Sequence, residues 1–503
     1  MELPKFPESY WLTSTSIPSY PKLEQNIEVD VAIVGAGITG ITTAYLLSKH
    51  GLNIALIEAG QILTGTTGHT TAKITAQHGL IYDELIAHIG LEKTKLYYQA
   101  NDEALKFIKQ TVKAHAIPCD LKTEDAYIYT NSDESLAKLS KEFQAYQQLE
   151  LPSAMLPQAP LPFPTIAAIV MNDQAQFNPI KYLTALTDLA VKQGVQIYEN
   201  TTAVTVDKGD QAAVVTRDGH KIAAKHVLSC SHYPFHDGGS FYFARMYQER
   251  SYALCIKPLH AFPKGMYISA EEPTRSLRTV TVNGEEMVIV GGENHKTGQG
   301  ICTIKHYEAL QAFAEQTLSA QEILYRWSAQ DLVTLDKLPF IGQTDSDAPN
   351  IYVATGYKKW GMTTGTAAAL LLEKLVMGQE SPYEQLFTPS RFYADPTIKQ
   401  FIKTNADVAK HLVGGKLESL NRYPEHLSND EGAVVAVNGK RAGAYRDQDG
   451  QMHIVDTTCT HMGCEVEWNS GERTWDCPCH GSRFSFEGEV LDGPAKKPLK
   501  KIN

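Results

Sequence analysis

The alternation of apolar and polar residues predicts the same local fold, a strand followed by a turn and a helix, at two distant places. In the first place, residues 31–34 form an apolar run typical of a buried parallel strand, and residues 38–49 have the length and spacing of a helix. A second short strand follows and ends at Glu58. In the second place, from Asn350 onward, an apolar strand leads into a glycine-rich turn and a helix. Both places therefore predict α/β structure.

The pattern of apolar and polar residues is different in the segment between these two places and in the segment after them. Residues 194–231 read as several strands with turns at 207–210 and 218–219, as expected where a sheet is continued far along the sequence. Residues 378–426 are polar and contain several prolines, which indicates a connector with some structure of its own. Within that connector, residues 390–412 are compatible with one helix.

The last part of the chain has short alternating runs instead. From Glu431 these runs are interrupted by Asn438–Gly439 and Asp449–Gly450, which are hairpin signals and predict a small all-β module. A chain of 503 residues is also too long for a single hydrophobic core. We therefore expect three parts, with boundaries at residues 1–385, 386–427 and 428–503.

Charge and composition exclude some functions. A net charge of −11 argues against a nucleic-acid partner, because phosphate binding needs clustered Lys and Arg. The one basic cluster, Lys496, Lys497, Lys500 and Lys501, is interpreted as a solvated end rather than a binding site. The first thirty residues lack the apolar core of a signal peptide, and no stretch reaches the ~18 apolar residues that span a bilayer. We expect a cytoplasmic protein without a membrane span.

The first turn carries the chemistry of a dinucleotide site. Gly35, Gly37 and Gly40 form a G-x-G-x-x-G pattern between strand and helix, which allows a tight turn, close approach to a pyrophosphate and helix–strand packing. The carboxylate of Glu58 can accept hydrogen bonds from an adenosine ribose. This unit is shared by FAD and NAD sites. The sequence has no second G-x-G-x-x-G pattern followed by an acidic residue, so it gives no sign of a separate NAD(P)H site.

Residues 1 to about 385 resemble the FAD-dependent amine and amino-acid oxidoreductases of the D-amino-acid oxidase, glycine oxidase and sarcosine dehydrogenase family. The resemblance rests on the dinucleotide unit, "GTTGHTTAKIT", "WSAQDLVTLDKLPFIG" and "ATGYKKWGMTTG". It implies a Rossmann-like FAD domain of the glutathione-reductase type, a mixed sheet that covers the flavin, and hydride removal from a carbon next to nitrogen. The implied FAD-binding residues are Gly35, Gly37, Ile38, Thr39, Gly40, Glu58, Thr66, Thr67, His69, Val204, Gly356, Gly361, Met362 and Thr363.

Two residues of this part have alternative interpretations. His69 lies where the sarcosine and dimethylglycine dehydrogenases attach their flavin covalently, but Gly68 replaces their Trp, so a histidine that only hydrogen-bonds its loop is the alternative. Lys358 matches the lysine that holds a substrate carboxylate in monomeric sarcosine oxidases. The alternative there is a surface lysine, and Lys359 is the neighbouring competitor.

Near the C-terminus, cysteine and histidine alternate in two short motifs. Cys459 and His461 form C-x-H, and Cys477 and His480 form C-x-x-H. Zinc fingers usually place two cysteines first and two histidines together, so zinc fits poorly. A Rieske 2Fe-2S cluster needs two thiolates on one iron and two imidazoles on the other. The spacing therefore favours an iron–sulfur cluster with these four ligands.

Residues 428 to 503 resemble Rieske domains through "CTHMGC", "CPCHGS" and "DGPA". This resemblance implies a disulfide between Cys464 and Cys479, and a hydroxyl of Ser482 that raises the cluster potential. High-potential members have a tyrosine where this chain has Phe484. We therefore expect a mid-range potential within the Rieske window of about −150 to +300 mV.

The combination predicts an FAD-dependent dehydrogenase. It would oxidise a small amine or amino acid and pass electrons singly through one 2Fe-2S cluster to an external acceptor, a protein or a quinone. Weak oxidase activity is expected, since the cluster offers an outlet other than oxygen. The alternative is a flavin and iron–sulfur redox carrier or sensor without a dedicated substrate. A reductase that runs from NAD(P)H to the cluster is a third hypothesis, which the missing second nucleotide motif disfavours.

Overall fold

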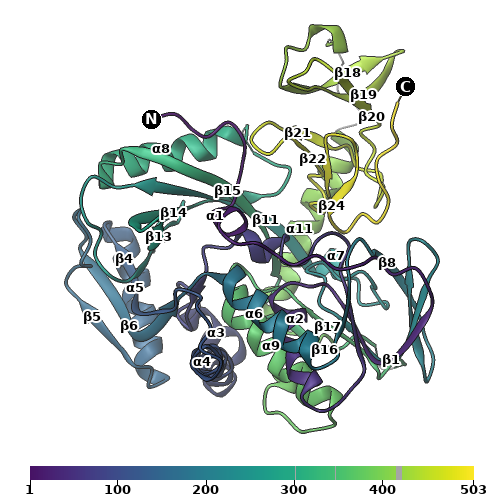
Figure 1. Ribbon diagram of the computed structural model, residues 1–503. Coiled ribbons are helices and arrows are strands. Elements are labelled where there is room, and N and C mark those ends of the chain that lie inside the picture. The colour runs from purple at the N-terminus through teal and green to yellow at the C-terminus, as the bar shows by residue number, and fades with distance from the viewer. Residues whose placement is uncertain (301, 346, 415–421, 503) are drawn as a thin grey trace.

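Figure 1 shows two sheet-based domains with a small β module stacked above them. The computed structural model describes residues 1–300, 302–345, 347–414 and 422–502. Three short helices lie in the connections between larger elements, namely α1 (Tyr10–Thr13), η1 (Thr66–His69) and α7 (Tyr242–Arg245).

Both strand–turn–helix places belong to one sheet. β1 (Ile27–Val34) pairs in parallel with β2 (Ile54–Ile57) and β10 (Lys221–Ser229), and β10 pairs in parallel with β17 (Ile351–Thr355). The predicted parallel strands are thus confirmed, and their apolar residues are buried because helices cover the sheet. The other strands of this sheet are β7 (Gln196–Tyr198), β8 (Ala203–Asp207), β9 (Ala212–Thr216) and β16 (Phe340–Gln343).

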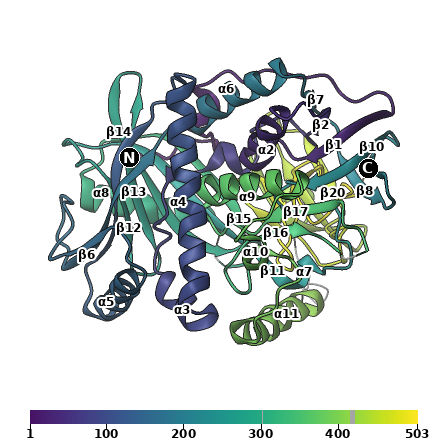
Figure 2. The same ribbon diagram turned by 90° about the horizontal axis from the view of Figure 1, so that it is seen from below.

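The two predicted helices pack against each other. α2 (Ile38–Ser48) and α9 (Gly361–Val376) lie side by side on the sheet (Figure 2). A Cβ on Gly365 would lie 2.9 Å from Thr39 Oγ1, so this glycine lets the two helices approach. The helices that complete this layer are α3 (Tyr82–Ile89), α4 (Leu91–Ala114) and α6 (Pro179–Lys192).

The second domain is built on a nine-stranded mixed sheet. Its two long strands at one edge, β15 (Glu322–Thr334) and β11 (Met246–Lys257), are antiparallel neighbours, and helix α8 (Ile304–Leu318) packs on β11. The remaining strands are β3 (Lys73–Ile74), β4 (Lys122–Thr130), β5 (Ser153–Leu156), β6 (Ala167–Gln176), β12 (Met266–Ser269), β13 (Arg275–Val282) and β14 (Glu285–Lys296), with helix α5 (Asp133–Gln148) beside them.

The connector contains the predicted helix. α11 (Ala394–Gly414) follows α10 (Glu384–Phe387), and η3 (Pro424–His426) precedes the β module. α11 begins four residues later than predicted, two residues before Pro396, which is tolerated in the first turn of a helix. Among the described helices, none combines the length and the apolar character that crossing a bilayer requires.

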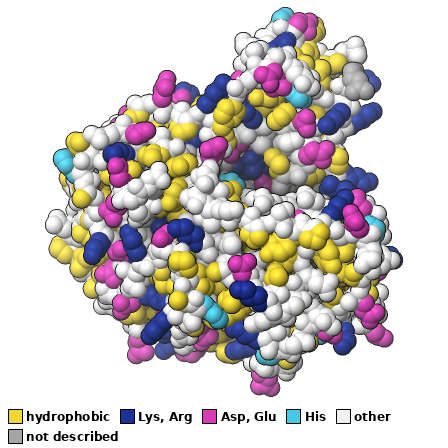
Figure 3. Space-filling view, viewed as in Figure 1, with side chains coloured by type: hydrophobic (Ala, Val, Ile, Leu, Met, Phe, Trp, Pro, Cys, Tyr) yellow, Lys and Arg dark blue, Asp and Glu magenta, His cyan; other side chains and the backbone are white. Residues whose placement is uncertain are grey.

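The C-terminal module is all-β, as predicted. Asn438 and Gly439 both have positive φ, 50° and 75°, which suits the two-residue hairpin turn that the sequence indicates. Figure 3 shows the module as an upper lobe with a notch on its left side. Its two antiparallel sheets consist of β18 (Glu431–Val437), β19 (Lys440–Arg446) and β20 (Met452–Val455), and of β21 (Glu467–Asn469), β22 (Thr474–Asp476), β23 (Arg483–Ser485) and β24 (Val490–Asp492).

Candidate flavin and cluster sites

The glycine-rich turn lies at the carboxyl ends of β1 and β2. A Cβ on Gly35 would lie 2.5 Å from the carbonyl oxygen of Cys230, and one on Gly40 would lie 1.9 Å from that of Gly35. Only glycine fits at these two positions, because backbone atoms cannot move aside. Helix α2 starts at Ile38, and its N-cap residue Gly37 has no side chain to cap it; apart from the N–H of Ile38, which donates to Thr67, its N-terminus can offer N–H groups and the positive end of its dipole to a pyrophosphate.

Glu58 lies beside this turn, as the sequence predicts. Its carboxylate accepts hydrogen bonds from the backbone N–H of Ala36, at 2.8 Å, and of Gly60, at 3.2 Å. Burial raises the pKa of Glu58, and these backbone donors oppose that effect. Each carboxylate oxygen has a further lone pair, so the group fits a ribose hydroxyl.

The loop around η1 lies between the glycine-rich turn and the second sheet. Thr67 Oγ1 accepts a hydrogen bond from Ile38 N–H at 3.1 Å, and Thr66 Oγ1 donates to the carbonyl of Gln330 in β15 at 3.2 Å. His69 Nδ1 is 2.9 Å from the carbonyl of Gly65. Burial lowers the pKa of His69, so the neutral imidazole donates to its own loop. That contact is the one expected of a histidine that orders the loop.

The second glycine-rich turn brings most of the remaining predicted residues to the same place. Tyr357, after Gly356, contacts Thr39 through their hydroxyls at 3.0 Å, and Thr363 donates to the carbonyl of Thr75 at 3.0 Å. The turn and the start of α9, with Gly361 and Met362, thus join α2 and the loop after η1. Val204 lies apart, at an irregularity in β8, and its carbonyl accepts a hydrogen bond from Lys496 at 3.0 Å.

Lys358 and Lys359 differ in their surroundings. Lys359 forms an ion pair with Glu249 at 2.8 Å, and the nearby Lys337 pairs with Glu84 at 2.5 Å. Lys358 has no such carboxylate partner among the residues that the structure describes. Burial, reinforced by the neighbouring lysines, lowers the pKa of Lys358 to about 8. Lys358 is therefore the unmatched cation of this group.

The four predicted cluster ligands converge. The rings of His461 and His480 are perpendicular, with centroids 5.0 Å apart, and both cysteine thiols are buried. A hydrogen bond from Cys477 is the main cause that lowers the pKa of Cys459, to about 7. His480 Nδ1 is buried without a hydrogen-bond partner. A buried ring nitrogen with a free lone pair beside two thiols fits an iron ligand.

The neighbouring residues support the two cluster loops. Cys464 and Cys479 form a disulfide with an S–S distance of 2.02 Å, so the predicted bond is present. Their sulfurs also lie near that of Cys477, but a disulfide offers no thiolate to a metal. Ser482 Oγ accepts a hydrogen bond from Ala495 N–H at 3.0 Å, which ties the second loop to the "DGPA" segment.

The β module is docked on the second domain through β15, which the sequence did not predict. Alternate side chains of β15 point to opposite faces. On one face Trp327 donates to the carbonyl of His69 at 2.9 Å; on the other, Arg326 donates to that of Gly471 and Gln330 Nε2 to that of Gly481, both at 2.9 Å. One sheet therefore separates the loop around η1 from the second cluster loop.

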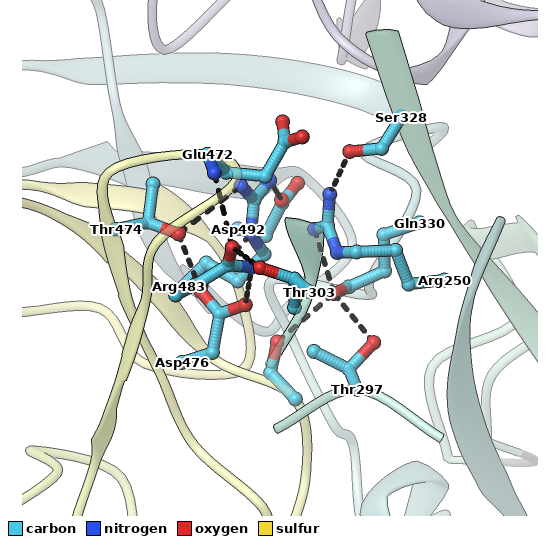
Figure 4. A network of polar contacts seen from close by, with 12 residues as sticks. Arg250, Thr297, Thr303, Ser328, Gln330, Glu472, Thr474, Asp476, Arg483 and Asp492 are labelled. Carbon is cyan, nitrogen blue, oxygen red and sulfur yellow. Dashed lines mark hydrogen bonds and ion pairs between the residues drawn. The ribbon is translucent and has the colours of Figure 1, made fainter. Parts of the chain in front are cut away.

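Buried polar groups hold this interface together (Figure 4). On the oxidoreductase side, Thr297 and Arg250 donate to Gln330 Oε1 at 2.9 and 3.4 Å. On the module side, Arg483 pairs with Asp492 at 2.9 Å, and Glu472 accepts a hydrogen bond from the hydroxyl of Tyr307 at 2.7 Å. The network also includes Thr303 and Ser328 of the oxidoreductase part and Thr474 and Asp476 of the module. A polar signal existed in the sequence: Arg326, Ser328 and Gln330 alternate on one face of a strand.

Close backbone approach also defines the interface. A Cβ on Gly298 would lie 2.6 Å from the backbone nitrogen of Pro478, and one on Gly481 would lie 2.7 Å from the side chain of Gln248. Nearby, the ring of Phe243 in α7 contacts both histidine rings, with centroids 5.9 Å from His461 and 5.7 Å from His480. Phe243 thus covers part of the histidine side of the module, and His461 stays only half-buried.

Comparisons with known proteins agree with this architecture. The family model of FAD dependent oxidoreductases matches residues 30–375, and that of the Rieske [2Fe-2S] domain matches residues 421–503. The chain therefore belongs to the FAD dependent oxidoreductase family and carries a C-terminal Rieske domain. Its family domain binds FAD, and its Rieske domain binds one 2Fe-2S cluster.

Individual relatives cover different parts of the chain. YhfW of Bacillus subtilis, named as a Rieske 2Fe-2S iron-sulfur protein, is 52% identical over 99% of this chain and 98% of its own length. The gamma-glutamylputrescine oxidoreductase of Escherichia coli is 22% identical over 75% of this chain and 90% of its own. The structure of glycine oxidase from Geobacillus kaustophilus has a TM-score of 0.62 at 18% identity, covering 73% of this chain and 100% of its own. The last two show the fold alone.

Proposed function

We propose that this protein is a dehydrogenase that oxidises a small amino acid at its C–N bond and passes the electrons singly through the Rieske cluster to an external acceptor. Bound FAD supplies hydride acceptance, and the cluster supplies one-electron transfer. The observation that carries the proposal is the position of Gln330. Its carbonyl accepts a hydrogen bond from the loop around η1, and its side chain donates to the second cluster loop.

Lys358 supports an amino acid over a simple amine as the substrate. An ammonium that is half-buried and lacks a carboxylate partner in the described structure offers a charge-assisted hydrogen bond to a substrate carboxylate. The FAD-binding part of the chain is similar to proteins that are named as a glycine oxidase and a gamma-glutamylputrescine oxidoreductase. The cytoplasm stays the proposed compartment, because the thiols of Cys119, Cys230 and Cys255 are unpaired.

The test is anaerobic mixing of the holoenzyme with a panel of N-methyl and D-amino acids. Flavin bleaching and the paramagnetic signal of the reduced cluster are followed in the same reaction. We expect at least one substrate to bleach the flavin and then generate the cluster signal. Bleaching without the cluster signal would contradict the internal electron route. No bleaching by any member of the panel would favour a carrier or sensor without a dedicated substrate.

A further inference from the structure

The two histidines of the cluster site differ in exposure. His480 is 4% exposed, and the next residue, Gly481, accepts the hydrogen bond from Gln330 inside the interface. His461 is half-buried and is flanked by Thr460 and Met462, both exposed. One edge of the cluster site therefore faces the oxidoreductase domain, and the other edge reaches the surface.

The basic cluster lies at this outer edge of the cluster site. From the sequence alone it is interpreted as a solvated end. Thr460, between two predicted ligands, donates from its hydroxyl to the carbonyl of Lys497 at 2.6 Å. Lys496, just before it, donates to the carbonyl of Val204 at 3.0 Å, so this segment runs between the cluster loop and the FAD-binding sheet. Lys500 and Lys501 continue the same exposed segment. Figure 1 shows the C-terminal segment along the right-hand edge of the molecule, and Figure 3 shows Lys and Arg side chains, with some Asp and Glu among them, along that edge.

This patch, which we call the lysine rim (Lys496, Lys497, Lys500 and Lys501), is poorly neutralised. The one carboxylate within ion-pair distance of its described lysines is Glu487, 4.0 Å from Lys501. The chain as a whole has a net charge of −11. Four lysines within six residues therefore make this segment positively charged on a protein that is negatively charged overall. A local positive field next to an electron-transfer edge attracts and orients an anionic partner.

We propose that the lysine rim is the docking surface for an acidic one-electron carrier protein that exchanges electrons with the cluster through the His461 edge. This inference deepens the proposed function by assigning the class of the external acceptor. In each exchange one electron passes between the 2Fe-2S cluster and the carrier, and no bond forms or breaks. A carrier protein is favoured over a membrane because the rim adjoins the cluster edge at His461, where a redox partner can exchange an electron, whereas a lipid surface neither accepts nor delivers one.

The test uses the holoenzyme and a reduced, acidic plant-type ferredoxin as the probe. Its potential of about −400 mV lies below the Rieske window, so it delivers one electron to the oxidised cluster. The variant is Lys497→Glu with Lys500→Glu. Thr460 and Asp456 donate hydrogen bonds to the backbone carbonyls of Lys497 and Lys500, so these bonds are retained in the variant. We expect the second-order rate at low salt to fall at least tenfold, because steered association is worth 10- to 1,000-fold, and salt to slow the wild type more than the variant.

The matched control is Lys138→Glu with Lys141→Glu on α5, which makes the same change in net charge on the far domain. We expect the control to keep the wild-type rate. Equal rates in both variants would overturn the proposal. So would loss of binding to phosphatidylserine-containing vesicles in the rim variant without a change in the ferredoxin rate, which would assign the rim to a membrane. The assay needs no amino-acid substrate, so its outcome is independent of the dehydrogenase hypothesis.

Discussion

At the scale of single residues, Lys358 is the residue that we propose selects a substrate with a carboxylate. Replacing it with Met should raise KM for an amino-acid substrate by roughly 10- to 100-fold, the equivalent of a charge-assisted hydrogen bond of about 1.5–3 kcal/mol. Steady-state kinetics would measure this effect. Lys359→Met is the matched control, with a smaller effect expected because Glu249 already neutralises Lys359. An equal effect on an amine without a carboxylate would contradict the assignment.

The same residue predicts a pH dependence. The pKa of Lys358 is lowered to about 8, mainly by burial. The ammonium that would bind a carboxylate is present below this pH and is lost above it. We expect kcat/KM for the amino acid to fall as pH rises through about 8 in the wild type. Lys358→Met should lack this limb of the profile, and a limb that persists in the variant would assign it to another group.

His69 makes a prediction about how FAD is held. Its Nδ1 hydrogen bond to the carbonyl of Gly65 orders the loop around η1 without requiring a covalent bond. We therefore expect acid precipitation of the holoenzyme to release yellow FAD into the supernatant. Flavin that stays with the precipitate, and is released in His69→Ala, would establish covalent attachment instead.

Phe484 bears on the cluster potential. The ring is fully buried in the module core, where it cannot donate a hydrogen bond to a ligand sulfur. We expect Phe484→Tyr to raise the potential towards the upper part of the window of about −150 to +300 mV. Voltammetry of the full chain would measure both forms, with Phe486→Tyr as a control on a ring outside that core. A wild-type value already at the upper limit would refute the expectation.

At the scale of elements, β15 joins the two redox sites, and Gln330 is the residue to test. Gln330→Met removes the hydrogen bond to Gly481, worth about 1 kcal/mol, which corresponds to a roughly fivefold change in an equilibrium. We expect slower reduction of the cluster after flavin reduction, by about that factor, at unchanged cluster potential. Rapid mixing would measure the rate.

The control for this experiment is Gln299→Met. Gln299 also donates to a cluster-loop carbonyl, that of Pro478 at 3.0 Å, but it has no contact with the loop around η1. Cluster reduction in this variant should stay near the wild-type rate. If both glutamine variants slow it equally, general loosening of the interface is the cause, and Gln330 has no special role.

Local patterns predicted the elements but not their assembly. The apolar strand, the glycines and the C-x-H and C-x-x-H spacing reflect contacts within a few residues, so β1, α2 and the cluster loops were predictable. Phe243 lies in the short helix α7 and Gln330 lies in β15, and their roles depend on contacts with a domain that follows them in the chain. The position of the lysine rim was not predictable for the same reason: the sequence places it at the chain end, whereas the hydrogen bond from Thr460 to the Lys497 carbonyl places it beside a cluster loop.

At the scale of the whole molecule, an FAD-binding domain and a Rieske domain are docked in one chain. Arg326, Gln330 and Tyr307 all donate to the module across the interface. In the proposed function, the docked cluster gives the flavin's electrons an outlet that does not require oxygen. We expect peroxide formation at a small fraction of turnover with an added one-electron acceptor, measured in air with a peroxidase-coupled assay. Peroxide at the full turnover rate would contradict this expectation.

Gly298 bears on how such a fusion can arise. A side chain there would collide with the backbone of Pro478, which cannot yield, and the positive φ of 72° favours glycine at this position as well. A chimera that grafts this Rieske domain onto an oxidoreductase with another residue at that position would prevent the domain from docking as it does here. A residue other than glycine at this position is therefore a marker, readable from sequence, of a chain whose cluster domain cannot dock in this way.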